Sequence, residues 1–197
     1  MIAKGERRKP VAKKENFLTV TRPELLADAQ DKEFRAMLYD FFAFGSVLDT
    51  ARAGFATYVG LSPTQYLGLI VIARANPEEP VGVNQVAQRL RLTGAFVTNE
   101  VNKLVQDGLV EKKPHPTDGR RVQLFATRAG WDKLTHLAAF QRPVNDALFE
   151  TLTGEEFLQL KNIMKRLAEG GPRALQLAKY YQNDGQIRSA RDEAVSP

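Results

Sequence analysis

The clearest regular pattern of apolar positions lies in the first third of the chain. Between residues 23 and 59, apolar side chains recur at alternating spacings of three and four, at Phe34, Met37, Phe41, Phe44, Leu48, Ala51 and Phe55. This spacing places them on one stripe of a helix, as in the seam of a coiled coil. We therefore expect one long helix over residues 23–59. Its stripe either packs inside the chain or forms a dimerisation surface.

A second apolar run, YLGLIVIA at residues 66–73, follows a strong helix-start signal. Ser62 is a favoured N-cap residue, and Pro63 suits the first helical position. The sequence NPEEP at 76–80 cannot continue a helix, so we expect this helix to end near Ala75. Residues 81–83 then have the length of a single rung of strand.

Two short amphipathic segments separated by a tight turn predict a helix–turn–helix. The first covers residues 84–90. In the second, residues 93–107, Val97, Val101 and Leu104 recur at i, i+4 and i+7 and form an inward face. The outward face carries small and polar residues that can meet base edges and phosphates, although a neutral surface helix can carry the same types. These outward residues are Ala95, Thr98, Asn99, Asn102 and Lys103.

A β-hairpin is predicted directly after these helices, and this order is that of a winged helix. The strands are expected at residues 109–113 and 121–127, with PHPTDG as the loop. Asp118 lies two residues before Arg120, so its carboxylate can hold the guanidinium for insertion into a minor groove. Arg121 and Lys112 are better placed for phosphates. The alternative is an ordinary surface ion pair of about 0–1 kcal/mol.

Helical patterns return after the hairpin. Residues 131–152 are expected to form a helix with Leu134, Leu137, Val144 and Leu148 inward. Thr153 and Glu156 have the spacing of a capping box for the next helix, which we expect to end at Gly170, within EGGP. A further helical piece over 173–181 and a loose tail from Asp184 complete the chain.

The charge is distributed unevenly over the 197 residues. Residues 1–23 carry seven basic and two acidic side chains, and residues 83–128 carry eight and four. The basic excess therefore coincides with the predicted winged helix, which favours a local polyanion-binding face over general solubility. Residues 1–16 have the composition of a disordered tail or of an arm that follows DNA. No signal peptide or membrane span is expected, so the cytoplasm is the expected location.

The order of these motifs resembles the MarR family of transcription factors over residues 34–167. The most specific part is DGLVEKKPHPTDGRRVQLFATRAG, which ends in a Thr-x-x-Gly motif that opens a helix. The resemblance implies a homodimer of winged helices on a pseudo-palindromic operator, with two recognition helices in successive major grooves. It places Asp118 and Arg120 at the wing tip, and Ala95, Thr98, Asn99 and Asn102 on the recognition face. The TGAF sequence at 93–96 departs from the family, which more often has small polar residues there.

The expected fold class is mainly α (α+β), a winged helix–turn–helix domain embedded in a helical dimerisation frame. The expected parts are a basic disordered arm (residues 1–22), an N-terminal dimerisation helix (23–60), the winged helix–turn–helix domain (61–128), C-terminal dimerisation helices (129–183) and a flexible tail (184–197).

The resemblance also implies regulation by a small molecule, often an aromatic acid. Regulation by cysteine oxidation is closed to a chain without cysteine. Phe44, Leu48 and Arg52 share one helical stripe and can line a pocket, where Arg52 would pair with an aromatic carboxylate. Tyr66 or His136 would hydrogen bond to the ligand. The competing interpretation is a solvated arginine beside ordinary core aromatics.

These patterns favour a sequence-specific DNA-binding repressor that a ligand releases. The alternative is a winged-helix module that binds protein partners, or DNA non-specifically, without an effector. An enzyme is not expected, because the chain has two histidines, no cysteine and no visible nucleophile elbow, phosphate loop or metal-ligand cluster. No cofactor and no metal are expected for the same reason.

Overall fold

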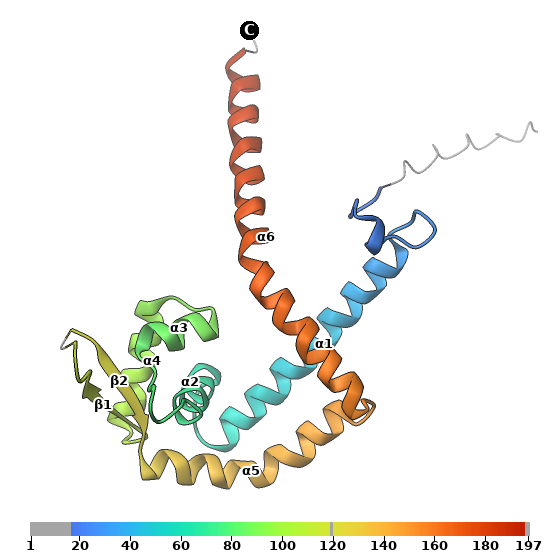
Figure 1. The fold of residues 1–197 in the computed structure, drawn as a ribbon. Helices are drawn as coiled ribbons and strands as arrows, with labels where there is room; N and C mark the ends of the chain where they lie inside the picture. The colour runs from blue at the N-terminus through green and yellow to red at the C-terminus, as the bar shows by residue number, and fades with distance from the viewer. Residues whose placement is uncertain (1–16, 119, 196–197) are drawn as a thin grey trace, which may run out of the picture. The chain divides into compact units, whose positions relative to one another are not determined.

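The computed structural model describes residues 17–118 and 120–195. The chain divides into two compact units, Met1–Gln141 and Arg142–Pro197, and each unit is considered by itself below. The predicted basic arm falls mostly on residues 1–16, which lie outside the described residues. The first unit holds four helices, a short 3₁₀ turn, a two-stranded sheet and most of a fifth helix (Figure 1).

The long N-terminal helix α1 (Lys32–Tyr58) starts nine residues later than expected. The prediction of a helical start at Pro23 is wrong, because Pro23–Leu25 forms only a 3₁₀ turn, η1. Asp28 and Ala29 then adopt positive φ values of 51° and 56°, which a continuing right-handed helix does not allow. The buried carboxylate of Asp31 accepts hydrogen bonds from the Thr19 backbone N–H and hydroxyl, and this ties the preceding segment to the helix.

Helix α2 (Pro63–Ala73) begins as the sequence predicted. Ser62 and Gln65 form a reciprocal capping box, with the Ser62 Oγ accepting from the Gln65 N–H at 3.1 Å. Helix α1 packs on α2 near its own C-terminal end, where Phe55 and Ala56 are buried. Among the described residues no single helix is long and apolar enough to cross a bilayer; α1 and α2 meet that test only as a pair bent by 83°.

The helix–turn–helix prediction is confirmed by α3 (Val83–Leu90) and α4 (Gly94–Gln106). The turn between them needs one left-handed residue, and Arg91 supplies it at φ 57°. Val97, Val101 and Leu104 are each at most 1% exposed, so the predicted inward face of α4 is correct. Thr93 has the extended backbone of an N-cap, but its side chain makes no cap hydrogen bond.

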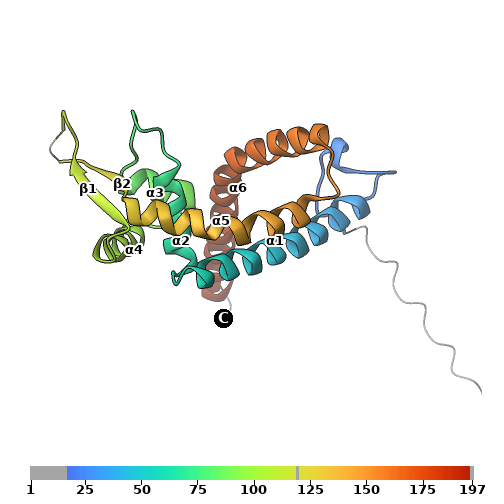
Figure 2. The same ribbon diagram turned by 90° about the horizontal axis from the view of Figure 1, so that it is seen from below.

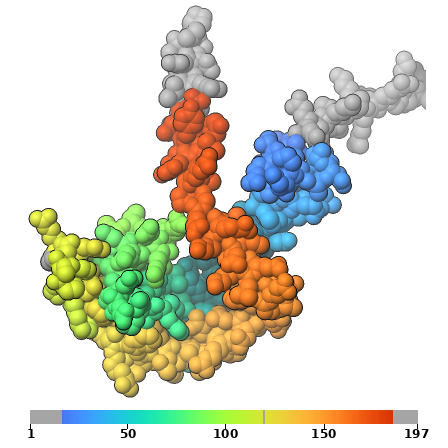
Figure 3. Space-filling view, in the orientation of Figure 1, coloured from blue at the N-terminus to red at the C-terminus, as the bar shows by residue number. Residues whose placement is uncertain are grey.

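The wing is confirmed as an antiparallel pair of strands, β1 (Val110–Pro114) and β2 (Val122–Ala126). The pair projects beyond α3 and α4 in both ribbon views and in the space-filling view (Figures 2 and 3). The strand expected at residues 81–83 is not formed, because Val83 already begins α3. One backbone bond, from Leu124 N–H to Val81 O at 2.9 Å, still attaches the wing to this segment.

Helix α5 (Arg128–Phe149) begins beside the wing. The Thr127 hydroxyl accepts from the Gly130 N–H at 3.1 Å and donates to the Gly108 carbonyl at 2.6 Å. Leu137 is fully buried, as predicted, whereas Leu134, Val144 and Leu148 are only half-buried. The boundary between the two units falls inside this helix, just before Pro143.

The second unit consists mainly of α6 (Gly154–Val195). Its capping box is confirmed, because the Glu156 carboxylate accepts from the Thr153 N–H and hydroxyl at 2.8 Å each. The predicted break at Gly170 and the loose tail from Asp184 are wrong, since the helix runs through Pro172 to Val195. Proline removes one backbone bond at a cost of about 3 kcal/mol, and Gly170 and Gly171 before it are also poor helix formers. The helix continues because the segments beyond them, KRLAE and RALQLAK, consist mainly of strong helix formers.

Candidate nucleic-acid interface

Helix α4 presents a polar outer surface next to the wing. Ala95 and Asn99 are exposed and Phe96 is 46% exposed, so the small, polar and aromatic positions at its start all reach solvent. The Thr98 hydroxyl is turned back onto the helix and donates to the Gly94 carbonyl at 2.8 Å. Thr98 therefore offers its methyl group and an acceptor oxygen rather than a free donor.

The wing and α4 are joined by one polar contact that the sequence did not indicate. Lys112 Nζ on β1 donates to Asn102 Oδ1 on α4 at 2.5 Å. A lysine can only donate, so this contact fixes which end of the Asn102 amide faces the wing. The remaining Asn102 group is an N–H₂ donor. The pair combines two residues that we had expected to act separately, one on a base and one on a phosphate.

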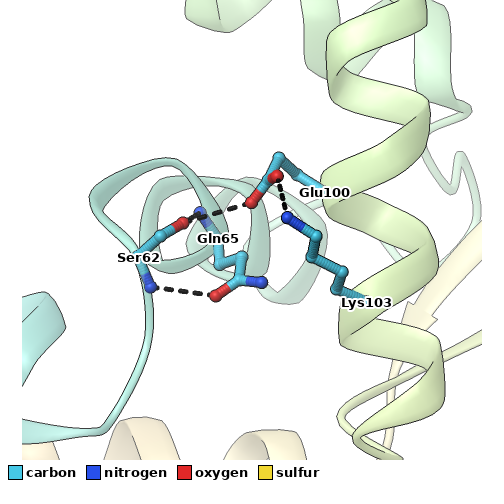
Figure 4. A network of polar contacts seen from close by, with 4 residues as sticks. All are labelled: Ser62, Gln65, Glu100 and Lys103. Carbon is cyan, nitrogen blue, oxygen red and sulfur yellow. Dashed lines mark hydrogen bonds and ion pairs between the residues drawn. The ribbon is translucent and has the colours of Figure 1, made fainter.

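Lys103 is engaged as well. Its Nζ lies 2.7 Å from Glu100 Oε1, and Glu100 Oε2 accepts from the Ser62 hydroxyl at 3.2 Å (Figure 4). Glu100 is only 7% exposed and was missed in the sequence. Its position completes the i, i+3, i+4, i+7 pattern with the inward residues of α4, and that spacing was the available signal.

The wing tip is shaped by Asp118, but not in the predicted way. Asp118 Oδ1 accepts from the Arg120 backbone N–H at 3.1 Å, and its carbonyl accepts from the Arg121 N–H at 2.9 Å. Among the described residues, no ion pair joins the Asp118 carboxylate to the Arg120 guanidinium. The expectation of a held guanidinium is therefore not met, because the carboxylate caps the turn instead, as aspartates often do.

Two cations on the described part of the wing are left without a partner. Lys112 binds Asn102, while Lys113 pairs with Glu111 at 2.7 Å and lies 4.8 Å from the centre of the Phe125 ring. Arg120 and Arg121 are exposed and make no side-chain contact of this kind. Positive charge at the tip is thus concentrated in these two guanidinium groups.

Arg121 also borders a polar cavity of about 350 Å³ between the wing, α3 and the loop before α3. His115 and Arg89 line the same cavity, and the His115 N–H donates to the Arg121 carbonyl at 3.0 Å. The base of the wing is therefore lined by polar residues, in contrast to the buried side of α4.

Two of the predicted ligand residues lie in one aromatic cluster of the first unit. Tyr66 is 3% exposed, burial raises the pKa of its phenol, and its oxygen accepts from Gln141 Nε2 at 2.8 Å. His136 stacks on Tyr58 with ring centroids 5.4 Å apart. Phe55 and Phe140, which were not among the predicted ligand residues, connect the two. Phe55 makes edge contacts with Tyr66 and Phe140, and the Phe140 ring lies tilted against that of Tyr58.

The other three predicted ligand residues lie on α1 before Phe55, towards the N-terminal end of that helix. Phe44 comes eleven residues before Phe55, which corresponds to about 16 Å of helix, and both Phe44 and Leu48 are 38% exposed. Arg52 lies closer to the cluster and pairs with Asp49 at 2.9 Å. Its buried Nε has no hydrogen-bond partner. The five residues therefore do not form one compact site.

The part of the chain that the structure describes contains no group of three or more His, Cys, Asp or Glu side chains that could hold a metal ion. The chemistry available at the α4 and wing surface is that of hydrogen-bond donors and guanidinium groups. Such groups suit recognition of a polyanion.

A polar helix presented beside a protruding hairpin, after a helix and a tight turn, defines a winged helix–turn–helix protein. Comparison with known proteins agrees. Residues 59–121 match the model of the MarR family. The transcriptional repressor MdtR of Bacillus subtilis is 27% identical over 110 residues, which are 56% of this chain and 69% of that relative. Over the winged helix, the chain is therefore similar to the MarR family of transcriptional regulators.

Solved structures share the fold. CouR from Rhodococcus jostii RHA1, in complex with p-coumaroyl-CoA, has a TM-score of 0.60 and 21% identity, and the match covers 67% of this chain and 91% of CouR. The apo form of MarR from E. coli has a TM-score of 0.51 and 19% identity, covering 64% of this chain and 92% of MarR. At these identities the likeness concerns the fold alone.

Proposed function

We propose that this chain is a sequence-specific, DNA-binding repressor that acts in the cytoplasm as a homodimer and is released by a small molecule. The observation that carries the proposal is the joint surface of α4 and the wing. The polar outer face of α4 and the unpaired guanidinium groups of Arg120 and Arg121 belong to one unit, and the Lys112–Asn102 contact links them. One duplex can therefore meet both.

In this proposal the residues of α4 read bases and those of the wing hold the backbone. Ala95, Thr98 and Asn99 face base edges in the major groove. Asn102 presents its N–H₂ group while Lys112 occupies its oxygen, and this favours an acceptor such as guanine O6 or N7 over the donor–acceptor edge of adenine.

The wing arginines act on the backbone. Arg120 reaches the minor groove from a turn that Asp118 shapes, and Arg121 and Lys112 contact phosphates. Lys103 is paired with Glu100 and is not included among these phosphate contacts.

The proposed homodimer is supported by large apolar side chains exposed on each unit. On α1, Tyr39 is 69% and Phe42 70% exposed, and on α6, Leu175 is 67% and Tyr180 64% exposed. A soluble chain does not usually leave such helix faces in water. We infer that a second copy covers them, with residues 23–60 and 129–183 as dimerisation segments around the winged helix of residues 61–128.

For the effector we propose an aromatic carboxylate. Arg52 offers a buried Nε without a partner, and the cluster that contains Tyr66 and His136 offers aromatic surface about one helical turn away. Phe44 and Leu48 extend this apolar surface along α1. A ligand here would favour a spacing of the two winged helices that does not fit adjacent major grooves.

The proposal is tested by fluorescence anisotropy with a duplex from the region upstream of the chain's own coding sequence. We expect saturable binding that weakens steeply with salt and survives competition by unrelated DNA. Arg120→Ala should weaken binding at least tenfold with unchanged thermal unfolding, and benzoate, as the simplest aromatic carboxylate, should lower the affinity. Equal affinity for an unrelated duplex would contradict specific recognition.

A further inference from the structure

The recognition helix contains a buried carboxylate. Among the residues that the structure describes, Asp31 and Glu100 are the two buried charged side chains, and Glu100 lies in the middle of α4. A carboxylate in this position is costly unless it is paired and hydrogen bonded. It also brings negative charge into a surface that we propose to face phosphates. The function of this carboxylate therefore needs an explanation beyond packing.

The contacts of Glu100 form a closed set (Figure 4). The Gln65 N–H donates to Ser62 Oγ at 3.1 Å, and the Ser62 hydroxyl donates to Glu100 Oε2 at 3.2 Å. Lys103 Nζ donates to Glu100 Oε1 at 2.7 Å. Both carboxylate oxygens are thus used, one by the N-cap of α2 and one by the next turn of α4.

These contacts have two consequences for α4. First, the helix is attached to the start of α2, where the positive end of the α2 dipole also favours a carboxylate. Second, Lys103 is the one basic residue and Glu100 the one acidic residue in the α4 sequence GAFVTNEVNKLVQ, so the pair leaves the helix without net charge. A helix without net charge gains little from phosphate attraction, and its affinity must come from hydrogen bonds and contacts to bases.

We propose that Glu100 is a specificity-determining, positioning residue. It neutralises and holds Lys103 and fixes α4 on the N-cap of α2, so that α4 discriminates between bases without adding sequence-independent attraction to DNA. This inference rests on the proposed function as a DNA-binding protein. A purely structural carboxylate would instead affect only the free energy of unfolding, and salt dependence of DNA binding separates the two.

The test compares the wild type with Glu100→Gln, Lys103→Gln and the double variant. The measurement is the dissociation constant for the upstream duplex and for a random duplex at several salt concentrations. Glutamine keeps the shape and can accept from Ser62, but leaves Lys103 unneutralised. We expect the slope of log K against log salt for Glu100→Gln to steepen by about 0.9, the value for one added phosphate contact.

Glu100→Gln should also bind the random duplex several-fold more tightly than the wild type does. Its preference for the upstream duplex should fall about tenfold. Lys103→Gln should keep the wild-type slope, because Lys103 is already neutralised, and the double variant should return to it. Thermal unfolding reports folding of each variant. If Glu100→Gln does not fold, the salt dependence of Lys103→Gln still tests whether Lys103 is neutralised. The Lys103 side chain is 56% exposed, so we expect this variant to fold.

An unchanged slope in a folded Glu100→Gln variant would overturn the inference, as would a slope about 0.9 shallower in Lys103→Gln. Failure of the wild type to bind any duplex would instead overturn the proposed function. The two failures are therefore distinguishable in one set of titrations.

Discussion

Gly130 shows at the scale of a single residue how closely the wing and α5 approach each other. A Cβ atom added at Gly130 would lie 2.3 Å from the Leu109 carbonyl oxygen. Leu109 cannot move freely, because its carbonyl accepts from the Thr127 N–H and its own N–H donates to Leu104 O. The glycine of the Thr-x-x-Gly motif therefore has a packing function as well as a place in the family pattern.

We predict that Gly130→Ala lowers the free energy of unfolding by about 1–3 kcal/mol, the usual effect of overpacking. The matched control is Gly54→Ala in α1, where an added Cβ meets no atom within 4 Å. There, helix propensity should raise the free energy of unfolding by up to about 1 kcal/mol. Urea unfolding measures both, and equal effects of the two substitutions would contradict the close approach.

Asp31 provides a pH-dependent contribution at the same scale. Hydrogen bonds from the Thr19 hydroxyl and then the Thr19 N–H, together with the charge of Arg35, lower the pKa of its carboxyl below the ordinary value of 3.8. The unfolded chain binds the proton more readily, so the stabilisation is present above about pH 4 and is lost as the pH falls through the folded-state pKa.

Asp31→Asn should therefore flatten the decline of stability between about pH 5 and pH 2, as measured by thermal unfolding. Asp40→Asn, at an exposed position of the same helix, is the control and should leave the decline as it is in the wild type. If Asp31→Asn declines as steeply as the wild type, the proposed contribution of Asp31 is absent.

At the scale of elements, the helix–turn–helix and the wing were predictable because their signals are local. The capping residues of α2, the i, i+4, i+7 spacing in α4 and the alternating strands each lie within about a dozen residues. The late start of α1 was not predictable, because it depends on positive φ values at Asp28 and Ala29. Aspartate adopts this conformation only occasionally and alanine rarely, so neither residue marks the turn as a glycine would. The passage of α6 through Pro172 depends on the whole helix.

In the candidate site, too, some features could be predicted from local sequence patterns and others could not. The outward residues of α4 followed from periodicity, whereas the partners of Asn102, Lys103 and Asp118 depend on geometry that spacing alone does not fix. Asp118 is the clearest case, because Asp-x-Arg suggested an ion pair and the structure has a backbone hydrogen bond.

Substitutions of Asp118 can distinguish the backbone hydrogen bond from an ion pair with Arg120. Asparagine retains an oxygen that can accept from the Arg120 N–H, so Asp118→Asn should bind the upstream duplex no more weakly than the wild type. Asp118→Ala removes a hydrogen bond of about 1 kcal/mol from the turn and should weaken binding by roughly three- to tenfold. An equal loss in both variants, measured by anisotropy, would instead favour a charge-held guanidinium.

At the scale of the whole molecule, the account requires two copies. The sequence left the stripe of α1 open between intrachain packing and dimerisation, and it predicted dimerisation helices over residues 129–183. The exposed phenylalanine, leucine and tyrosine side chains of α1 and α6 favour dimerisation. Sedimentation velocity at micromolar concentration should give a dimer. Leu175→Glu, which places a charge at a position that is now 67% exposed, should shift it towards monomer, whereas the control Lys161→Glu should not.

The central claim is that α4 and the wing of two such chains bind together to one defined site on duplex DNA. Hydroxyl-radical footprinting of the upstream region tests it most directly. We predict two protected patches whose centres lie about one helical turn, or a small multiple of it, apart, within a pseudo-palindrome. Uniform protection, or a cleavage pattern identical to that of free DNA at low ionic strength, would contradict the claim.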